Sequence, residues 1–201
     1  MVARWDDVLG KQAEALADNW VATQTGVDND LVNTALSVAA YRGDAARFDR
    51  YLAAAKSARD RETQQRLIWQ LGNFRDPQLA KRALSLILDG TFDIRDSAGI
   101  LWGVLNSREN RDLGLAWVTE HIDEMLAKRR DDENAWFLSG LAGSFCDAAR
   151  LKAAELLVTP RMAKVDGAEA YVTRSIEASM QCIARVSRQQ PALKKFLKLD
   201  H

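Results

Sequence analysis

The chain has 201 residues, of which 47% are hydrophobic and 28% are charged, and its 28 basic residues equal its 28 acidic residues. This composition excludes a disordered chain, and the zero net charge gives no overall attraction to nucleic acid or to a membrane surface. No apolar run approaches the roughly 20 residues that a membrane-spanning helix needs, and the first residues lack the order of a signal peptide. We therefore expect a soluble chain that binds no nucleic acid and has no membrane span.

Residues with strong helix propensity fill the stretches between three prolines and eleven glycines, and no stretch alternates at period two. This pattern predicts an all-α fold. In chain order, we predict helices at about residues 3–19, 30–41, 45–57, 61–73, 77–88, 94–106, 110–129, 133–144, 147–158, 167–188 and 191–198. Residues 20–29, between the first two helices, are expected to be disordered.

Short acidic residues, prolines and glycines mark several predicted helix ends. An aspartate at the N-cap accepts from the free amides of the first turn, and a proline in that turn loses no hydrogen bond. We predict N-caps at Asp44, Asp76 and Asp147, with first-turn prolines at Pro77 and Pro191. Glycine favours the left-handed conformation of helix ends, which we predict for Gly43, Gly90 and Gly167.

An internal repeat appears when the turns are aligned. Four segments share an apolar helix end and a short turn that closes on an acidic residue: Asp44, Asp76, Glu109 and Asp147. The successive spacings are 32, 33 and 38 residues, and a second helix follows each acid. This period is typical of an α-solenoid, in which helix pairs stack to bury their apolar faces. We predict an α-α superhelix of HEAT- or armadillo-like pairs. It forms a single domain over residues 1–201, with stacked pairs at 31–198 and a poorly matched leading segment at 1–30.

Tryptophans lie on the first helices of three successive predicted pairs, at Trp69, Trp102 and Trp136. Aromatic rings of this size bury a large apolar area. We therefore expect them to pack in the core between stacked repeats, with a binding wall on one face of the solenoid as the alternative.

The two cysteines, Cys146 and Cys182, are 36 residues apart and belong to no CxxC or Cys/His cluster. Such a pair argues against a disulfide framework and against a structural zinc site. The apolar neighbours at both positions suit small buried thiols. We therefore expect two unpaired thiols, a reducing compartment and a cytoplasmic location.

Residues for catalysis are scarce. His121 is the one histidine away from the chain end, and the zinc motif HExxH fails because Met125 stands where the second histidine belongs. We expect a half-exposed structural histidine. An enzyme that uses Cys146 or His121 is the least favoured hypothesis, because no base, orienting group or oxyanion motif accompanies either residue. The sequence therefore predicts no catalytic, cofactor-binding or metal-binding residue.

An ordered set of landmarks carries a family resemblance over about four fifths of the chain, from Leu36 to Leu197. The landmarks are residues 35–40 with 43–44, 62–72 with 76–79, 94–97, 115–118, 145–147, 167–168, 176–177, 182 and 190–197. In this order they resemble the C-terminal helical domain of the zinc metalloaminopeptidases related to aminopeptidase N, puromycin-sensitive aminopeptidase and the endoplasmic reticulum aminopeptidases. Residues 94–97 depart from the family's Arg-x-Gln-Asp, because the glutamine is missing.

The resemblance implies a non-catalytic role. Relatives carry zinc, the HExxH helix, a distal glutamate and a Gly-x-Met-Glu-Asn loop in an earlier domain, and their helical domain closes the chamber that holds the peptide. We expect this chain to be the C-terminal fragment of such an enzyme, with Met1 as an internal or artificial start. Its partners would be the catalytic domain, which would hold the zinc, and a peptide substrate. Truncation would also favour self-association.

Three residues are expected nearest the chamber: Arg95, Asp96 and Trp102. The reason is that the first helix of each pair lines one face of a solenoid. For Asp96, a structural salt bridge or an N-cap is the favoured alternative, because it lies two residues after Ile94 at a predicted helix start. The alternative function for the whole chain is a free-standing HEAT-like scaffold that binds a protein partner in its concave groove.

Overall fold

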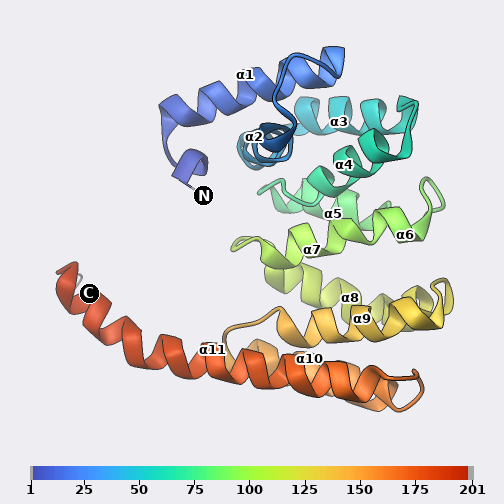
Figure 1. Cartoon of the computed structure of the whole chain (residues 1–201), viewed down its shortest axis with the longest axis vertical. Helices are drawn as coiled ribbons and strands as arrows, with labels where there is room; N and C mark the ends of the chain where they lie inside the picture. The colour runs from blue at the N-terminus through green and yellow to red at the C-terminus, as the bar shows by residue number, and fades with distance from the viewer. Residues whose placement is uncertain (1, 199–201) are drawn as a thin grey trace. The chain divides into compact units, whose positions relative to one another are not determined.

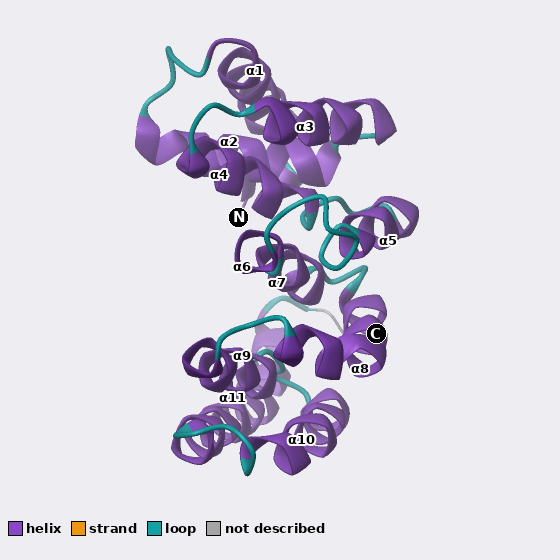
Figure 2. Cartoon of the chain, turned by 90° about the vertical axis from the view of Figure 1, so that its right-hand side faces the viewer, coloured by secondary structure: helices purple, strands orange, loops and turns teal. Residues whose placement is uncertain are grey.

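The computed structural model describes residues 2–198, and all regular elements in this range are helices (Figures 1 and 2). They are η1 (Val2–Arg4), α1 (Asp7–Thr23), α2 (Asn29–Arg42), α3 (Ala45–Ser57), α4 (Arg61–Leu71), α5 (Pro77–Ser85), α6 (Ile94–Ser97), α7 (Gly99–Asn106), α8 (Arg111–Ala127), α9 (Asp131–Gly143), α10 (Ala148–Met162) and α11 (Ala168–Phe196). The predicted all-α class is confirmed. The helices form two compact units, one ending at His121 and one beginning at Ile122, and each is described by itself. The single domain stays a prediction.

In the first unit, helices pack on their neighbours along the chain, α1 on α2 and α3 on α4. The first helices of successive pairs also pack on each other, α2 on α4 and α4 on α7. The core lies between these layers, where the ring centroids of Phe48 and Tyr51 are 5.2 and 6.0 Å from that of Phe74. All three rings are buried. This packing of consecutive helix pairs is that of an α-α superhelix, as predicted.

The crossing of α4 and α7 depends on two glycines. A Cβ atom on Gly103 would lie 2.8 Å from the carbonyl carbon of Gly72 and 3.0 Å from its Cα, which is too close for a side chain to fit. The two backbones are therefore in direct contact. The turns that follow these helices are also joined, because the Asn110 side chain donates to the carbonyl of Phe74 at 2.9 Å.

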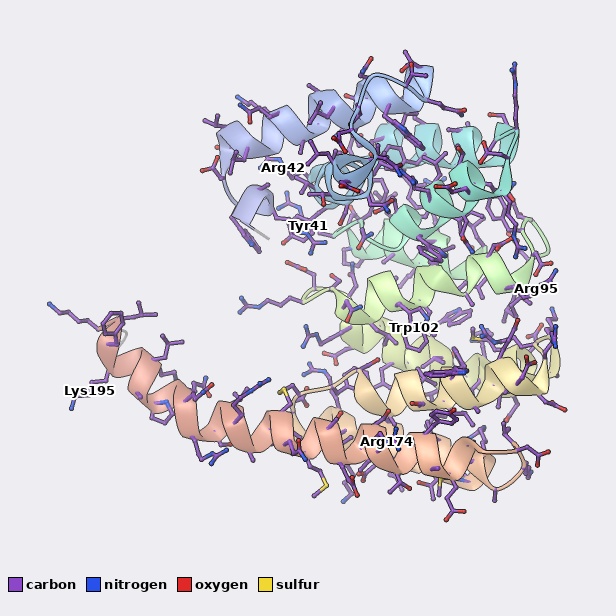
Figure 3. The ribbon with its side chains drawn as sticks, viewed as in Figure 1. Tyr41, Arg42, Arg95, Trp102, Arg174 and Lys195 are labelled. Carbon is purple, nitrogen blue, oxygen red and sulfur yellow. A yellow bond between two sulfur atoms is a disulfide. The ribbon has the colours of Figure 1, made fainter. Side chains whose placement is uncertain are left out.

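The leading segment is anchored to α2 by charged groups. The Arg42 guanidinium lies 2.8 Å from Glu14 and 3.2 Å from Asp7, both on α1. The guanidinium of Arg4 lies 4.8 Å from the centroid of the Tyr41 ring. Tyr41 and Arg42 are labelled at the end of α2 in Figure 3. These contacts hold η1 and α1 against the rest of the first unit.

The expectation of disorder from residue 20 is wrong. The side chain of Trp20 is buried, and α1 continues to Thr23. The Arg66 guanidinium lies 5.6 Å from the centroid of the Trp20 ring. This contact packs the end of α1 against α4.

In the second unit, α9 and α11 lie side by side and run in the same direction. Ser139 Oγ is 2.7 Å from Ser175 Oγ, and one turn later Ser179 Oγ donates to the carbonyl of Ala142 at 3.0 Å. These partners form what we call the α9/α11 seam. Helix α10 packs on both α9 and α11 and completes the unit.

The predicted helix starts are confirmed where a short acid precedes the helix. Asp44, Asp76 and Asp147 each accept a hydrogen bond from a first-turn amide, and Pro77 occupies the first turn of α5. The predicted left-handed glycines are confirmed at two of three positions, with φ of 81° at Gly90 and 72° at Gly167. Gly43 is extended, with φ of −80°, so that prediction is wrong.

Two predicted boundaries are also wrong. Pro191 does not begin a new helix, because α11 continues through it from Ala168 to Phe196. The helix predicted at 94–106 is divided at Ala98 into α6 and α7. The N-cap of α6 is Asp93, whose carboxylate accepts from the amide of Arg95 at 2.9 Å.

Candidate functional site

Asp96 is a structural residue in the first unit. Its side chain is only 7% exposed, and its carboxylate accepts from Arg61 at 2.9 Å and from the Gln65 amide at 3.0 Å. Both partners lie on α4, so the ion pair fastens α6 to α4. The salt-bridge alternative for Asp96 is therefore confirmed, whereas the N-cap role belongs to Asp93.

Arg95 lies at the solvent-exposed start of α6, as Figure 3 shows. Its guanidinium makes a two-point contact with Asp93, with distances of 3.0 and 2.6 Å. These hydrogen bonds lower the pKa of the Asp93 carboxyl to about 2. The pair stays ionised at neutral pH, which leaves Arg95 tied to its own helix start.

Trp102 is partly buried on α7. Trp69 on α4 is 46% exposed. Its indole Nε1 donates to the carbonyl of Asp96 at 3.1 Å, and its ring covers Gly99, one turn before Trp102. Core packing is therefore the wrong expectation for Trp69. We call Trp69 and Trp102 the α4/α7 aromatic surface.

The second unit carries a similar feature on its own first helices. Trp136 on α9 is 64% exposed, and its ring centroid lies 4.8 Å from that of Tyr171 on α11. Tyr171 is also exposed. Just beyond the rings, the Ser139 hydroxyl donates to the carbonyl of Tyr171 at 3.3 Å, which holds the two helices together. Core packing is also wrong for Trp136. We call Trp136 and Tyr171 the α9/α11 aromatic surface.

The signal for these exposed rings is present in the sequence. The buried residues of α4 are Leu67, Ile68, Gln70 and Leu71. Trp69 points about 200° away from Leu67 on a helix with 100° per residue, so it lies off the core stripe. Trp69, Trp136 and Tyr171 are thus exposed, and large exposed rings are typical anchors for a binding partner.

His121 has the structural role that the sequence predicted. Its Nδ1 donates to the carbonyl of Trp117 at 2.8 Å, and the two rings stack with centroids 4.5 Å apart. Within residues 2–198, no three His, Cys, Asp or Glu side chains gather closely enough to hold a metal ion. The zinc chemistry of aminopeptidases therefore has no ligand set in this part of the chain.

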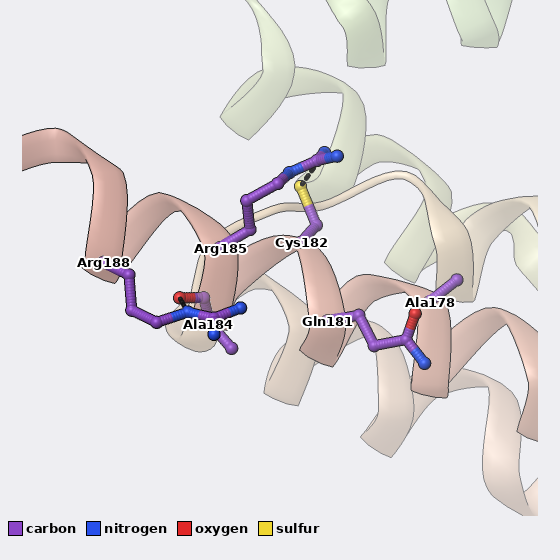
Figure 4. A pocket seen from close by; sticks show the side chains of 6 residues that line it. All are labelled: Ala178, Gln181, Cys182, Ala184, Arg185 and Arg188. Carbon is purple, nitrogen blue, oxygen red and sulfur yellow. Dashed lines mark hydrogen bonds between the residues drawn. The ribbon is translucent and has the colours of Figure 1, made fainter. Parts of the chain in front are cut away.

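Cys146 and Cys182 form a disulfide, so the expectation of two unpaired thiols is wrong. Cys146 follows α9 and Cys182 belongs to α11, so the bond extends the α9/α11 seam by another turn. A hollow on α11 beside Cys182 is lined by Ala178, Gln181, Cys182, Ala184, Arg185 and Arg188 (Figure 4). The bonded sulfurs are not available as nucleophiles, which removes Cys146 from the candidate catalytic residues.

Because Cys146 and Cys182 are bonded to each other, the cysteines no longer indicate a reducing compartment. Disulfides that persist are typical of oxidising environments. Within the part of the chain that the structure describes, no helix is both long enough and apolar enough to cross a membrane.

Comparison with known protein families agrees with this architecture. The family model described as ERAP1-like C-terminal domain matches residues 3–181. The match begins before Leu36, where the resemblance in the sequence starts, and it ends before Leu197. No curated protein shows significant similarity to the chain. Because the match spans most of the chain, the protein belongs to the ERAP1-like C-terminal domain family, the C-terminal helical domains of aminopeptidase-like proteins.

Proposed function

We propose that this chain is the non-catalytic C-terminal helical domain of a zinc aminopeptidase, in which it caps the active-site chamber and shapes the access of peptides. The family match is the observation that carries the proposal. The exposed rings on the first helices support it, because a domain that guides peptides needs side chains that contact apolar groups without reacting with them.

In this proposal each aromatic surface, taken by itself, offers a contact to apolar groups of a peptide. Trp69 is held by its hydrogen bond to the Asp96 carbonyl and by packing on Gly99, and its side chain is still exposed. Asp96 is a positioning residue that acts through Trp69. Arg95 and Trp102 remain proposed chamber-facing residues, with Arg95 already paired to Asp93. Rings held in place bind with little further loss of side-chain entropy.

Peptide binding by the purified chain tests this role. An unstructured peptide with aromatic and aliphatic residues should bind weakly, and Trp136→Ala should reduce the affinity about tenfold, as expected for an exposed aromatic anchor. Trp5→Ala is the matched control, because Trp5 is equally exposed but precedes α1. Isothermal titration calorimetry measures both. Equal losses in the two variants, or no binding by the unmodified chain, would contradict the proposal.

Two further measurements address the enzyme of which the domain would be part. The chain alone should hydrolyse no aminoacyl-arylamide and should bind no stoichiometric zinc, so zinc-dependent turnover by it would overturn the non-catalytic assignment. Sequencing the reading frame upstream of Met1 separates the two functions. A preceding HExxH domain supports the aminopeptidase, and its absence leaves the free-standing scaffold.

The cellular location is a separate proposal. We infer an oxidising compartment from the Cys146–Cys182 disulfide, in place of the cytoplasmic location expected from the sequence. Trapping free thiols with a maleimide during lysis tests it. Two unmodified cysteines in protein from the native source are expected, and two labelled ones would restore the cytoplasmic prediction.

A further inference from the structure

The last turns of α11 leave the packed part of the second unit without cover. Every residue from Ala184 to Lys198 is exposed, whereas α11 still contributes the buried Ser179 to the seam with α9. Figure 1 shows this end of α11 continuing beyond α9 and α10. The family match ends at residue 181, before this exposed segment begins. We call residues 184–198 the α11 extension.

The charge of the α11 extension differs sharply from that of the rest of the chain. It carries five basic residues, which are Arg185, Arg188, Lys194, Lys195 and Lys198, and its sequence contains no acidic residue. Because the whole chain is neutral, the remaining residues carry five excess negative charges. The helical part of the extension, residues 184–196, reaches about 20 Å, more than twice the screening length of about 8 Å at physiological salt. The outer end of the extension is therefore screened from the acidic residues on the packed helices of its own unit.

The apolar residues of the extension share one side of the helix. At 100° per residue, Val186, Leu193 and Phe196 fall within an arc of about 80°, and Leu197 follows at the helix end. All four are exposed, Phe196 to 82%. Arg185 and Lys194 flank this arc on either side, so two cations border an apolar face.

The two arginines near the start of the extension are held on the helix itself. Arg185 Nη2 lies 3.9 Å from Cys182 Sγ, and Arg188 Nε donates to the carbonyl of Ala184 at 3.3 Å (Figure 4). Neither of these contacts neutralises a guanidinium charge. Both positive charges therefore remain available to an anionic surface.

We propose that the α11 extension lies on an anionic membrane surface, with Val186, Leu193, Phe196 and Leu197 inserted among the acyl chains and the basic residues at the level of the headgroups. A basic amphipathic helix with aromatic and aliphatic residues on one face is the arrangement that binds in the plane of such a surface. This inference is independent of the proposed aminopeptidase role.

A groove on an acidic protein fits the extension less well. Helices that dock in grooves present anchors at i, i+3 or i+4, and i+7. From Val186, the i+3 and i+4 positions are Gln189 and Gln190, so the central anchors are missing. A lipid surface has no fixed pockets and tolerates that gap, because insertion depends on the total apolar area and on charge.

Co-sedimentation of the full chain with lipid vesicles tests the proposal. The chain should bind phosphatidylcholine vesicles that contain phosphatidylglycerol and should not bind vesicles of phosphatidylcholine alone, and added salt should release it. The double variant Lys194→Gln/Lys195→Gln should reduce the partition coefficient more than tenfold, because each basic residue contributes substantially near such a surface. Leu193→Ser/Phe196→Ser should reduce it at least as much.

The matched control is Leu156→Ser, which removes a leucine that is 71% exposed on α10. It should bind as the unmodified chain does, and circular dichroism should show that all variants stay helical. The proposal is overturned by equal binding to both kinds of vesicle, by no binding, or by a control that loses as much as the others. A lipid-free dimer in sedimentation velocity that Leu193→Ser/Phe196→Ser dissociates, without vesicle binding, would assign the face to a second copy and also overturn it.

Discussion

Breaking the Cys146–Cys182 disulfide should lower the free energy of unfolding of the second unit. The bond closes a chain segment with a sequence separation of 36. In the chain-entropy description, closing a loop of that length restricts the unfolded state by about 3.8 kcal/mol at 25 °C. Both cysteines are only partly buried, so their replacement by alanine removes little packing. We therefore expect Cys146→Ala/Cys182→Ala to lose about 3–4 kcal/mol.

Urea unfolding followed by circular dichroism measures this loss. With slopes of about 1–3 kcal/mol per molar urea for small proteins, the midpoint of the affected transition should fall by roughly 1–4 M. Hydrogen exchange should localise the change to α9, α10 and α11. Reduction of the unmodified chain should reproduce the variant's midpoint, and the same reductant should leave the double variant unchanged.

The reasoning is refuted if the oxidised chain and the double variant unfold at the same urea concentration. It is also refuted if the exchange of amides in the first unit changes as much as that in α9 and α11. The first result would mean that the covalent link adds no restriction beyond what the α9/α11 seam imposes through Ser139, Ser175 and Ser179. The second would mean that the stabilisation is not confined to the second unit.

Two more predictions concern the first unit. Gly103→Ala should lower the free energy of unfolding, measured by thermal unfolding, by about 1–3 kcal/mol, because its new Cβ would overlap the backbone of Gly72. The control Gly143→Ala should be neutral or slightly stabilising, because its Cβ would lie at an ordinary 3.5 Å from Ser175. Equal effects of the two substitutions would contradict the close crossing of α4 and α7. The folded-state pKa of Asp93 is lowered to about 2, so its contribution is present above the ordinary value near 3.9 and is lost as the pH falls through about 2. Because the Asp93 carboxylate is exposed, its contribution to the free energy of unfolding should stay below about 1 kcal/mol. The urea midpoint of the unmodified chain should therefore fall slightly between these two pH values, and Asp93→Asn, which can still cap α6, should remove this pH dependence. A variant with the same pH profile as the unmodified chain would contradict the prediction.

The helix starts could be predicted because their causes are local. An aspartate before an apolar run accepts from first-turn amides whatever surrounds it, which explains the success at Asp44, Asp76 and Asp147. The close approach of Gly72 and Gly103 could not be predicted, because it depends on where two distant helices cross. The α4/α7 aromatic surface could be predicted in part, because a helical projection already places Trp69 off the core stripe.

The continuity of α11 through Pro191 has a different reason. A proline inside a helix removes one hydrogen bond and crowds the preceding turn, a change that normally ends or kinks the helix. Here the residues around Pro191 are exposed, so water can satisfy the carbonyl group that loses its donor. The rule that a proline ends a helix therefore predicted a boundary at Pro191, where water can replace the missing hydrogen bond and the helix continues. In the headgroup region of a membrane, water and polar groups would also be present to hydrogen-bond to this carbonyl group.

The disulfide joins two residues that are one repeat apart in the sequence and lie side by side in the fold. Ser139 meets Ser175 across the α9/α11 seam at an offset of 36 residues, and Ala142 meets Ser179 at an offset of 37. Cys146 and Cys182 have the same offset of 36, one turn further along. The spacings between aligned turns in the sequence are 32 to 38 residues, and the two cysteines were expected to be unpaired because they belong to no CxxC or Cys/His cluster. In stacked repeats, however, residues one period apart occupy equivalent places on neighbouring helices. Two cysteines separated by one repeat are therefore brought together by the fold, and that spacing predicts a bond.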